Sequence, residues 1–340
     1  MSCRRPLPLL ALALALALAV LAGCRSEDDG PERPNGGSGA LAGLAGVRDT
    51  RSGLEEIEDG VRGLVIVADL DEDITVAQLT TVLETLAAER PDFATLSLGW
   101  GELPDDTSSL GGKDLVDLAY ATLPPTATER AEQFLTAART FDGSVTLGPR
   151  GTQVVLADES PDAVTAAIRT TLADPVLRQV PDLSIRTGQR QPRDSSGLAA
   201  HAPVTAATLA RWRALRGTLD LAPAGATAQT WIGEAGAVSD PAAPTRVRLD
   251  LVLPGVDRKG VVTPTAWGDR LWPLLRAQLD VVATLPRGTT YDVRVDVSGG
   301  GLPATDDLVA LTLGAGPTPG RPPTAWDRRA ASYLESVTRG

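Results

Sequence analysis

Apolar residues recur along the chain in strand–helix–strand patterns, the first of which covers residues 64–100. It begins with the continuous apolar run 64–68, typical of a strand buried on both faces. Thr75 and Gln78 then have the spacing of a helix capping box, and the helix after them keeps one face apolar through Val76, Leu79, Leu83 and Leu86. Pro91 ends that helix, and residues 95–100 return as a strand.

Two further copies of this order are predicted. The second runs from a strand at 152–157, through a helix opened by Ser160 and Pro161, to a strand at 183–185. The third begins with a strand at 246–253, in which Val247, Leu249, Leu251 and Leu253 face the core and Arg246, Arg248 and Asp250 face solvent. Helical sequence then covers 265–285, where Pro273 should kink the helix or begin a second one, before a strand at 291–297. A strand at 308–313 and a helix at 326–337 end the chain.

These patterns predict an α+β fold: two α/β-sandwich domains built from repeated strand–helix–strand units, with mixed or antiparallel sheets and helices on one face. The first domain would cover residues 48–188 and the second residues 204–340. Between them, residues 189–203 form the predicted linker, because this segment is polar and contains Pro192 and Gly197. All three phenylalanines precede it, whereas five of the six tryptophans follow it.

A tetrapeptide, Pro-Thr-Ala-Trp, occurs at residues 264–267 and again at 323–326, each time at a predicted helix start. Four residues are too few to establish a repeat.

The first 24 residues have the organisation of an export signal. Arg4 and Arg5 precede an uncharged, leucine- and alanine-rich run at 7–21, and small residues follow. The segment Leu21, Ala22, Gly23 and Cys24 resembles the lipobox of bacterial prolipoproteins. The resemblance implies cleavage before Cys24, acyl chains on that cysteine, and a protein held on the extracytoplasmic face of the cell membrane. The alternative is an uncleaved transmembrane anchor, which generally needs ~20 apolar residues, more than the run at 7–21 contains.

Residues 24–47 are rich in glycine, proline and charge, which predicts a flexible tether. Removing residues 1–23 leaves 30 basic and 43 acidic residues, a net charge of −13. Such a chain should be repelled by nucleic acid. Cys24 is the one cysteine left, so neither a disulfide nor a thiolate metal site is expected, and the sequence predicts no cofactor.

The densest acidic cluster, Asp69, Asp71 and Asp73, follows the strand at 64–68 and is the candidate polar site. It does not fit a calcium loop, because Ile74 and Thr80 stand where glycine and glutamate are needed. It also resembles the Asp-x-Asp of haloacid dehalogenase-like phosphotransferases, which implies a nucleophile and an acid/base. Asp73 departs from that family, which has threonine or valine there. The alternative is a solvated turn before Thr75.

Other candidates are weaker. His201, the one histidine, lies in the predicted linker and is expected to be exposed; no Gly-x-Ser-x-Gly elbow accompanies it. The glycine-rich segment 298–301 could hold an anion or form a turn. The late tryptophans could stack on a ligand, although Trp267 has the spacing to pack beside Leu271 in the core, and Trp100 is the one expected to be exposed.

We therefore expect a membrane-anchored, non-enzymatic binding or scaffold protein of the cell envelope, with an envelope protein as its partner. The alternatives are a substrate-binding lipoprotein of a transporter and a carboxylate-dependent hydrolase using Asp69 and Asp71. A deep cleft between the two predicted domains would favour the transporter alternative.

Overall fold

The structure is a computed structural model that describes residues 36–58, 61–89, 94–100, 116–117, 126–148, 151–188, 195–236, 242–253, 262–297 and 308–338. The predicted α+β class is confirmed: seven helices accompany two sheets in these residues. Among the helices described, none combines the length and the apolar character needed to cross a membrane.

A four-stranded mixed sheet forms first along the chain. Its strands are β1 (Val47–Glu58), β2 (Val61–Leu70), β3 (Ala94–Trp100) and β4 (Val116–Asp117), in the order β1-β2-β3-β4. Helix α2 (Gly36–Leu41) precedes them, and α3 (Val76–Glu89) connects the parallel strands β2 and β3. The predicted capping box opens α3: the Thr75 amide donates to Gln78 Oε1 at 2.8 Å, and the Gln78 amide donates to Thr75 Oγ1 at 3.3 Å.

A nine-stranded mixed sheet follows, with its strands in sequence order from β5 to β13. Its strands are β5 (Gly143–Gly148), β6 (Gly151–Leu156), β7 (Asp182–Thr187), β8 (Gly197–His201), β9 (Thr227–Gly233), β10 (Arg246–Leu253), β11 (Thr290–Val297), β12 (Val309–Thr312) and β13 (Gly316–Pro317). The helices around it are α4 (Ala127–Thr140), α5 (Pro161–Ala173), α6 (Ala206–Thr218), α7 (Pro264–Val282) and α8 (Ala325–Thr338), with short 3₁₀ turns η2 (Leu177–Gln179) and η4 (Leu219–Leu221).

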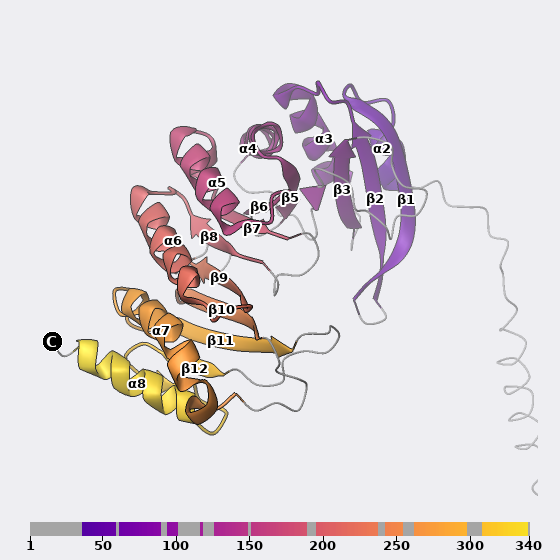
Figure 1. The fold of residues 1–340 in the computed structure, drawn as a ribbon. Helices are drawn as coiled ribbons and strands as arrows, with labels where there is room; N and C mark the ends of the chain where they lie inside the picture. The colour runs from indigo at the N-terminus through magenta and orange to yellow at the C-terminus, as the bar shows by residue number, and fades with distance from the viewer. Residues whose placement is uncertain are drawn as a thin grey trace, which may run out of the picture. The chain divides into compact units, whose positions relative to one another are not determined.

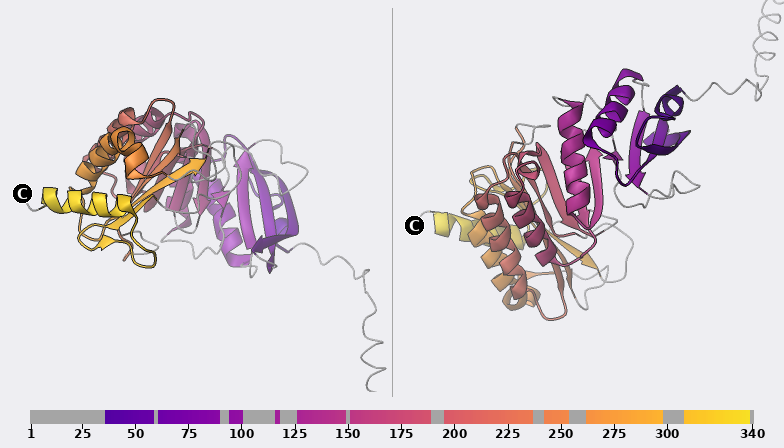
Figure 2. Two further views of the ribbon diagram at one scale, coloured as in Figure 1. Left: turned by 60° about the horizontal axis from the view of Figure 1, so that its bottom comes forward. Right: turned by 90° about the horizontal axis from the view of Figure 1, so that it is seen from above.

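Antiparallel and parallel neighbours alternate from β5 to β12, and the last pair, β12 with β13, is antiparallel like the one before it. The parallel pairs are β6 with β7, β8 with β9 and β10 with β11, and each is connected by one helix: α5, α6 or α7. The large sheet is therefore a row of three strand–helix–strand units, and β2-α3-β3 is a fourth in the small sheet. Figures 1 and 2 show α5, α6, α7 and α8 side by side along one side of the large sheet.

Within the linker predicted at residues 189–203, Gly197–His201 form strand β8 of the large sheet, which pairs with β7 and β9. The sheet runs without a break through the domain boundary predicted at residues 189–203. A Cβ at Gly197 would stand 2.4 Å from the Ile185 carbonyl oxygen, so the glycine that suggested a loop allows two strands to approach closely.

The third predicted unit is confirmed in its alternation, with one correction. Val247, Leu249, Leu251 and Leu253 are all buried in the core. Asp250, expected to face solvent, is only 7% exposed. Its buried carboxylate is compensated by Arg248, whose Nε donates to Asp250 Oδ2 at 2.6 Å. Helix α7 continues through Pro273 as one helix.

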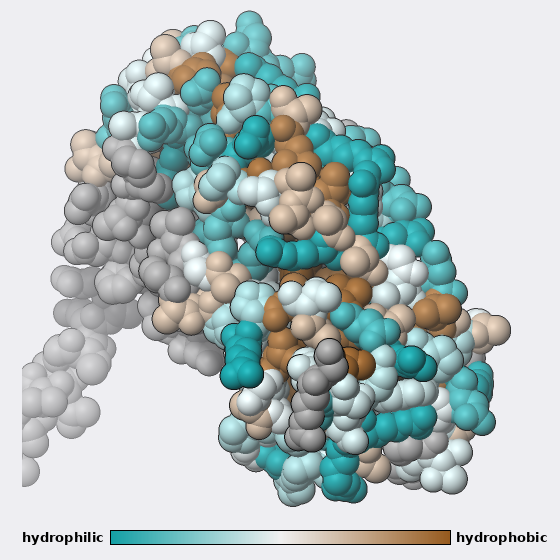
Figure 3. Space-filling view, turned by 90° about the vertical axis from the view of Figure 1, so that its left-hand side faces the viewer, coloured by the Kyte–Doolittle hydropathy of each residue, from teal (hydrophilic) through white to brown (hydrophobic). Residues whose placement is uncertain are grey.

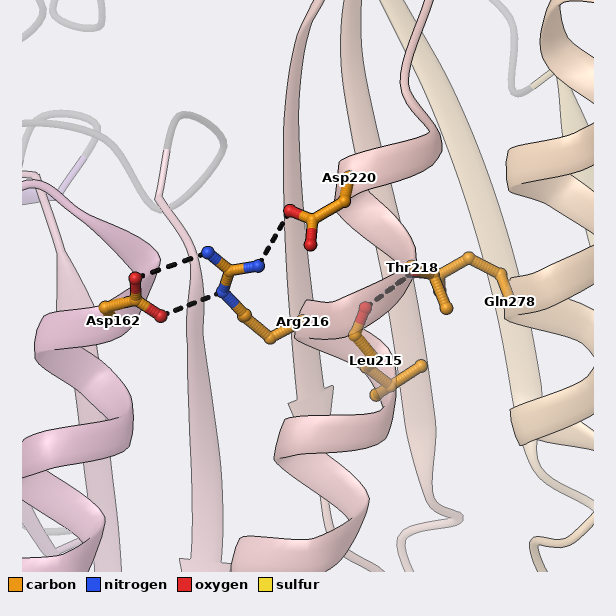
Figure 4. A network of polar contacts seen from close by, with 6 residues as sticks. All are labelled: Asp162, Leu215, Arg216, Thr218, Asp220 and Gln278. Atoms are coloured by element: carbon orange, nitrogen blue, oxygen red, sulfur yellow. Dashed lines mark hydrogen bonds and ion pairs between the residues drawn. The ribbon is translucent and has the colours of Figure 1, made fainter.

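Polar contacts join α6 to both neighbouring helices (Figure 4). Arg216 of α6 makes a two-pronged ion pair with Asp162 of α5, at 2.9 and 3.3 Å, and donates to Asp220 at 2.8 Å. These contacts raise the pKa of Arg216. On the other side, the buried Gln278 amide of α7 donates to Thr218 Oγ1 and to the Leu215 carbonyl oxygen of α6. One continuous apolar core, which includes Trp212, Tyr291 and Trp326, lies beneath these helices.

Candidate functional site

The lipobox residues lie outside the described residues: Leu21, Ala22, Gly23 and Cys24. Cleavage and lipidation therefore stay predictions. The glycine-rich segment 298–301 also lies outside them, and so does the side chain of Trp100.

Two of the three predicted acidic residues meet at one arginine. Asp69, at the end of β2, is 3% exposed, and its Oδ2 lies 3.5 Å from Arg48 Nη1. Asp71 is partly exposed, and its Oδ1 lies 3.6 Å from Arg48 Nε. Asp73 is exposed in the turn before α3. Of the three predicted carboxylates, two therefore lie near one cation, Arg48, which the sequence pattern did not indicate.

The backbone explains how Arg48 reaches both carboxylates. The pairing of β1 with β2 shifts register between Val47 and Asp49, so Arg48 is an extra residue in β1. A bulge of this kind redirects a side chain. One guanidinium between two carboxylates leaves a net charge of −1, half of what the carboxylates alone would offer a cation. Within the described residues, no group of three or more His, Cys, Asp or Glu side chains could hold a metal ion.

His201 is not the exposed loop residue that the sequence predicted. It ends β8, and its side chain is 15% exposed. Its Nδ1 lies 2.5 Å from Asp182 Oδ1, and its Nε2 lies 3.0 Å from the Glu234 carbonyl oxygen. The imidazole thus ties β7 to the residue after β9, and neither ring nitrogen is left to act on a substrate.

The tryptophans of the second half fall into two groups. Trp212 and Trp326 are core residues, 0% and 2% exposed, and their indole N–H groups donate to Thr165 Oγ1 and to the Val262 carbonyl oxygen. Trp231, Trp267 and Trp272 are partly exposed. The expectation that Trp267 packs on the core is confirmed in part, because the ring contacts the core and keeps an accessible side.

Contacts between arginines and aromatic rings gather on helices α7 and α8. We define the aromatic–arginine surface by its members: Trp267, Arg270, Trp272, Arg276, Arg329 and Tyr333. Helices α7 and α8 lie on the helical side of the large sheet (Figure 1), and the face seen in Figure 3 has apolar residues interspersed with polar ones. All six side chains are at least partly exposed.

Cation–π contacts hold this surface in place. The Arg270 guanidinium carbon lies 4.2 Å from the centre of the Trp267 ring, and that of Arg329 lies 4.1 Å from Trp272. Trp272 meets Tyr333 edge to face, at 5.7 Å between ring centres. Gly268 leaves room for this arrangement, because a Cβ there would stand 3.1 Å from Arg329 Nη1.

Tyr333 connects the aromatic contacts to a polar chain. Its hydroxyl accepts from Arg276 Nε at 3.0 Å and donates to Asp280 Oδ1 at 2.5 Å. The first of these hydrogen bonds raises the pKa of Arg276.

Arg270 and Arg329 differ from Arg276 and Arg216 in one chemical respect. Their guanidinium groups contact rings and, within the described residues, donate no hydrogen bond. A ring face satisfies the charge but not the N–H donors, of which each arginine has five. The aromatic–arginine surface therefore offers donors in a fixed position, next to flat apolar area.

A signal for this surface was present in the sequence. The repeated Pro-Thr-Ala-Trp is followed in both copies by an arginine three residues after the tryptophan, Arg270 after Trp267 and Arg329 after Trp326. On a helix this spacing brings arginine and ring together. The two copies stand differently in their helices, because Trp267 is the fourth residue of α7 and Trp326 the second of α8.

No protein-family model matches the chain, and neither a curated protein nor a solved structure matches it. The candidate sites therefore depend on their own geometry and chemistry.

Proposed function

We propose that this protein is a lipid-anchored, non-enzymatic binding or scaffold protein of the cell envelope. In this proposal, Cys24 attaches it to the extracytoplasmic face of the membrane, and the aromatic–arginine surface of α7 and α8 binds a partner protein that presents carboxylates.

The observation that carries the proposal is the pair of arginines held over tryptophan rings with their N–H donors unused. Tryptophan, tyrosine and arginine contribute most of the binding energy in protein interfaces. Side chains already fixed by ring contacts lose little further freedom on binding, which favours affinity. The chain as a whole is acidic, so a local group of arginines gives an acidic partner one preferred place to dock.

The transporter alternative is less well supported. It expected a cleft between residues 48–188 and 204–340, and β7, β8 and β9 instead pass from one segment to the other as adjacent strands of one sheet. The hydrolase alternative needs Asp69 and Asp71 to share a substrate, and both already face Arg48.

The test is capture of a partner from native membranes by the full chain, comparing the double variant R270M/R329M with the wild type. Loss of two interface arginines should reduce recovery of the partner at least ~10-fold, because a single such arginine contributes more than ~1 kcal/mol. The matched control is R216M on α6, whose donors are already used by Asp162 and Asp220, and it should recover the partner normally. Equal recovery by R270M/R329M and the wild type would refute the proposed surface.

The anchor is tested separately. Cys24→Ala should release the protein from the membrane fraction and leave its circular dichroism spectrum unchanged, because Cys24 precedes α2 and Leu41, the first residue of the described core. A variant that stayed with the membrane would show that lipid on Cys24 is not the anchor.

A further inference from the structure

Arg130 of α4 is a buried cation without a counter-charge. The residue is 5% exposed, on the same helix face as Ala131, Phe134, Leu135 and Ala137. Within the described residues, no oxygen accepts a hydrogen bond from its side chain, and Nη1 is fully enclosed without a partner. By contrast, a hydrogen-bond acceptor or an ion-pair partner is present for Arg48, Arg139, Arg216, Arg248 and Arg276, and a ring for Arg270 and Arg329.

The surroundings of Arg130 raise the free-energy cost of burying its charge. Burial lowers the pKa of Arg130 from 12.5 to about 10, and no nearby carboxylate offsets the effect. Arg130 is the fourth residue of α4, close to the positive end of the helix dipole, where a cation is disfavoured and an anion is favoured. A buried charge of this kind ordinarily requires a partner.

The polar groups beside Arg130 contact other parts of the chain. Thr126 caps α4 by accepting from the Glu129 amide at 3.1 Å, and Gln133 Nε2 donates to the Gln179 carbonyl oxygen of η2 at 3.5 Å. Within the described residues, neither side chain accepts a hydrogen bond from the guanidinium. Nε and Nη2 of Arg130 are not fully enclosed as Nη1 is, so the small accessible part of the guanidinium lies on their side.

We propose that Arg130 is the binding residue for an oxyanion, a phosphate or carboxylate group of a small ligand, at the N-terminal turn of α4. The planar fork of an arginine matches two oxygens of either group. The site is independent of the aromatic–arginine surface, which lies on α7 and α8, so either proposal can fail without the other.

The experiment measures the melting temperature of the full chain in sodium phosphate, sodium acetate and sodium chloride at equal ionic strength. Phosphate or acetate should raise the melting temperature of the wild type by about 5 °C at saturation, because a ligand that binds only the folded state stabilises it. Whichever of the two acts at the lower concentration identifies the group. A wild type that melts at the same temperature in all three salts would overturn the proposal.

Two variants of Arg130 and one control locate the effect. R130M should melt at or above the wild-type temperature in chloride and should not respond to phosphate or acetate. R130K keeps the charge without the fork, so its response should need at least ~10-fold more anion. R139M on the same helix loses a hydrogen bond to the Ile74 carbonyl oxygen, so it should be less stable yet keep the full response. An R130M or R130K variant with the wild-type response would place the anion elsewhere and contradict the proposal.

Discussion

The two joints on either side of α7 are built from different chemistry. Between α6 and α7, the buried Gln278 amide donates to two oxygens of α6, inside the core. Between α7 and α8, arginines lie over partly exposed rings at the surface. The first joint uses its polar groups internally and has little left to offer a partner. The second is held by contacts that leave N–H donors unused, so a joint between helices can also serve as a binding surface.

Gln278→Ala should have the largest effect on the polar joint. Removing a fully buried amide leaves a cavity beside α6 and should lower the free energy of unfolding by about 2–4 kcal/mol. Gln278→Leu fills that volume and should cost less than ~1 kcal/mol, since Gln278 Oε1 has no hydrogen-bond partner within the described residues. Chemical denaturation measures both. If leucine is as harmful as alanine, hydrogen bonds and not volume hold α6 to α7.

Two surface arginines, Arg216 between α5 and α6 and Arg329 between α7 and α8, should respond differently to salt. Arg216→Met should cost about 0.5 kcal/mol at low ionic strength and almost nothing in 1 M salt, because Asp162 and Asp220 are more than two-thirds exposed. Arg329→Met should cost about 0.5–1 kcal/mol with weaker salt dependence, since its partner is a ring and not an opposite charge. Denaturation in both salt conditions checks this contrast. If both variants showed the same salt dependence, the proposed difference between an ion-paired and a ring-stacked arginine would be wrong.

The smallest expected effect is on stability at low pH, and it involves Asp158, which lies just before α5. Hydrogen bonds from the Ser160 backbone, and then from its side chain, lower the pKa of Asp158 from 3.8. A carboxylate with a lowered pKa in the folded state contributes stability that is present above about pH 4 and is lost as pH falls through the folded-state pKa. NMR titration of Asp158 in wild type and Ser160→Ala should show a lower pKa in the wild type. Identical titration curves would exclude a contribution from the Ser160 side chain.

Local sequence signals predicted the elements that depend on local chemistry. The capping box at Thr75 and Gln78, the Ser160 cap and the alternation in β10 are each set by neighbours a few residues apart. A signal of this kind also precedes α4, although no helix was predicted there. Thr126 is followed three residues later by Glu129, and then by apolar Phe134 and Leu135.

Features set by distant residues were out of reach. Arg48 meets Asp69 and Asp71 because of a register shift between strands, which no local pattern encodes. His201 is partly buried because β8 is inserted between β7 and β9, although its own segment is short and follows a polar stretch. The stacking of Arg329 on Trp272 joins residues of two helices, so the repeated Pro-Thr-Ala-Trp predicted at most the local half of that surface.

The sequential strand order of the large sheet has a consequence for how the chain folds. Each strand from β5 to β13 hydrogen-bonds to strands adjacent in the sequence, so every pairing closes a loop no longer than one helix and its connections. Short loops lose little entropy on closing, and folding can begin at any unit and spread to the next. If the chain is exported amino end first, as proposed, this sheet can form in the order in which its residues arrive. Folding does not have to wait for the carboxyl end.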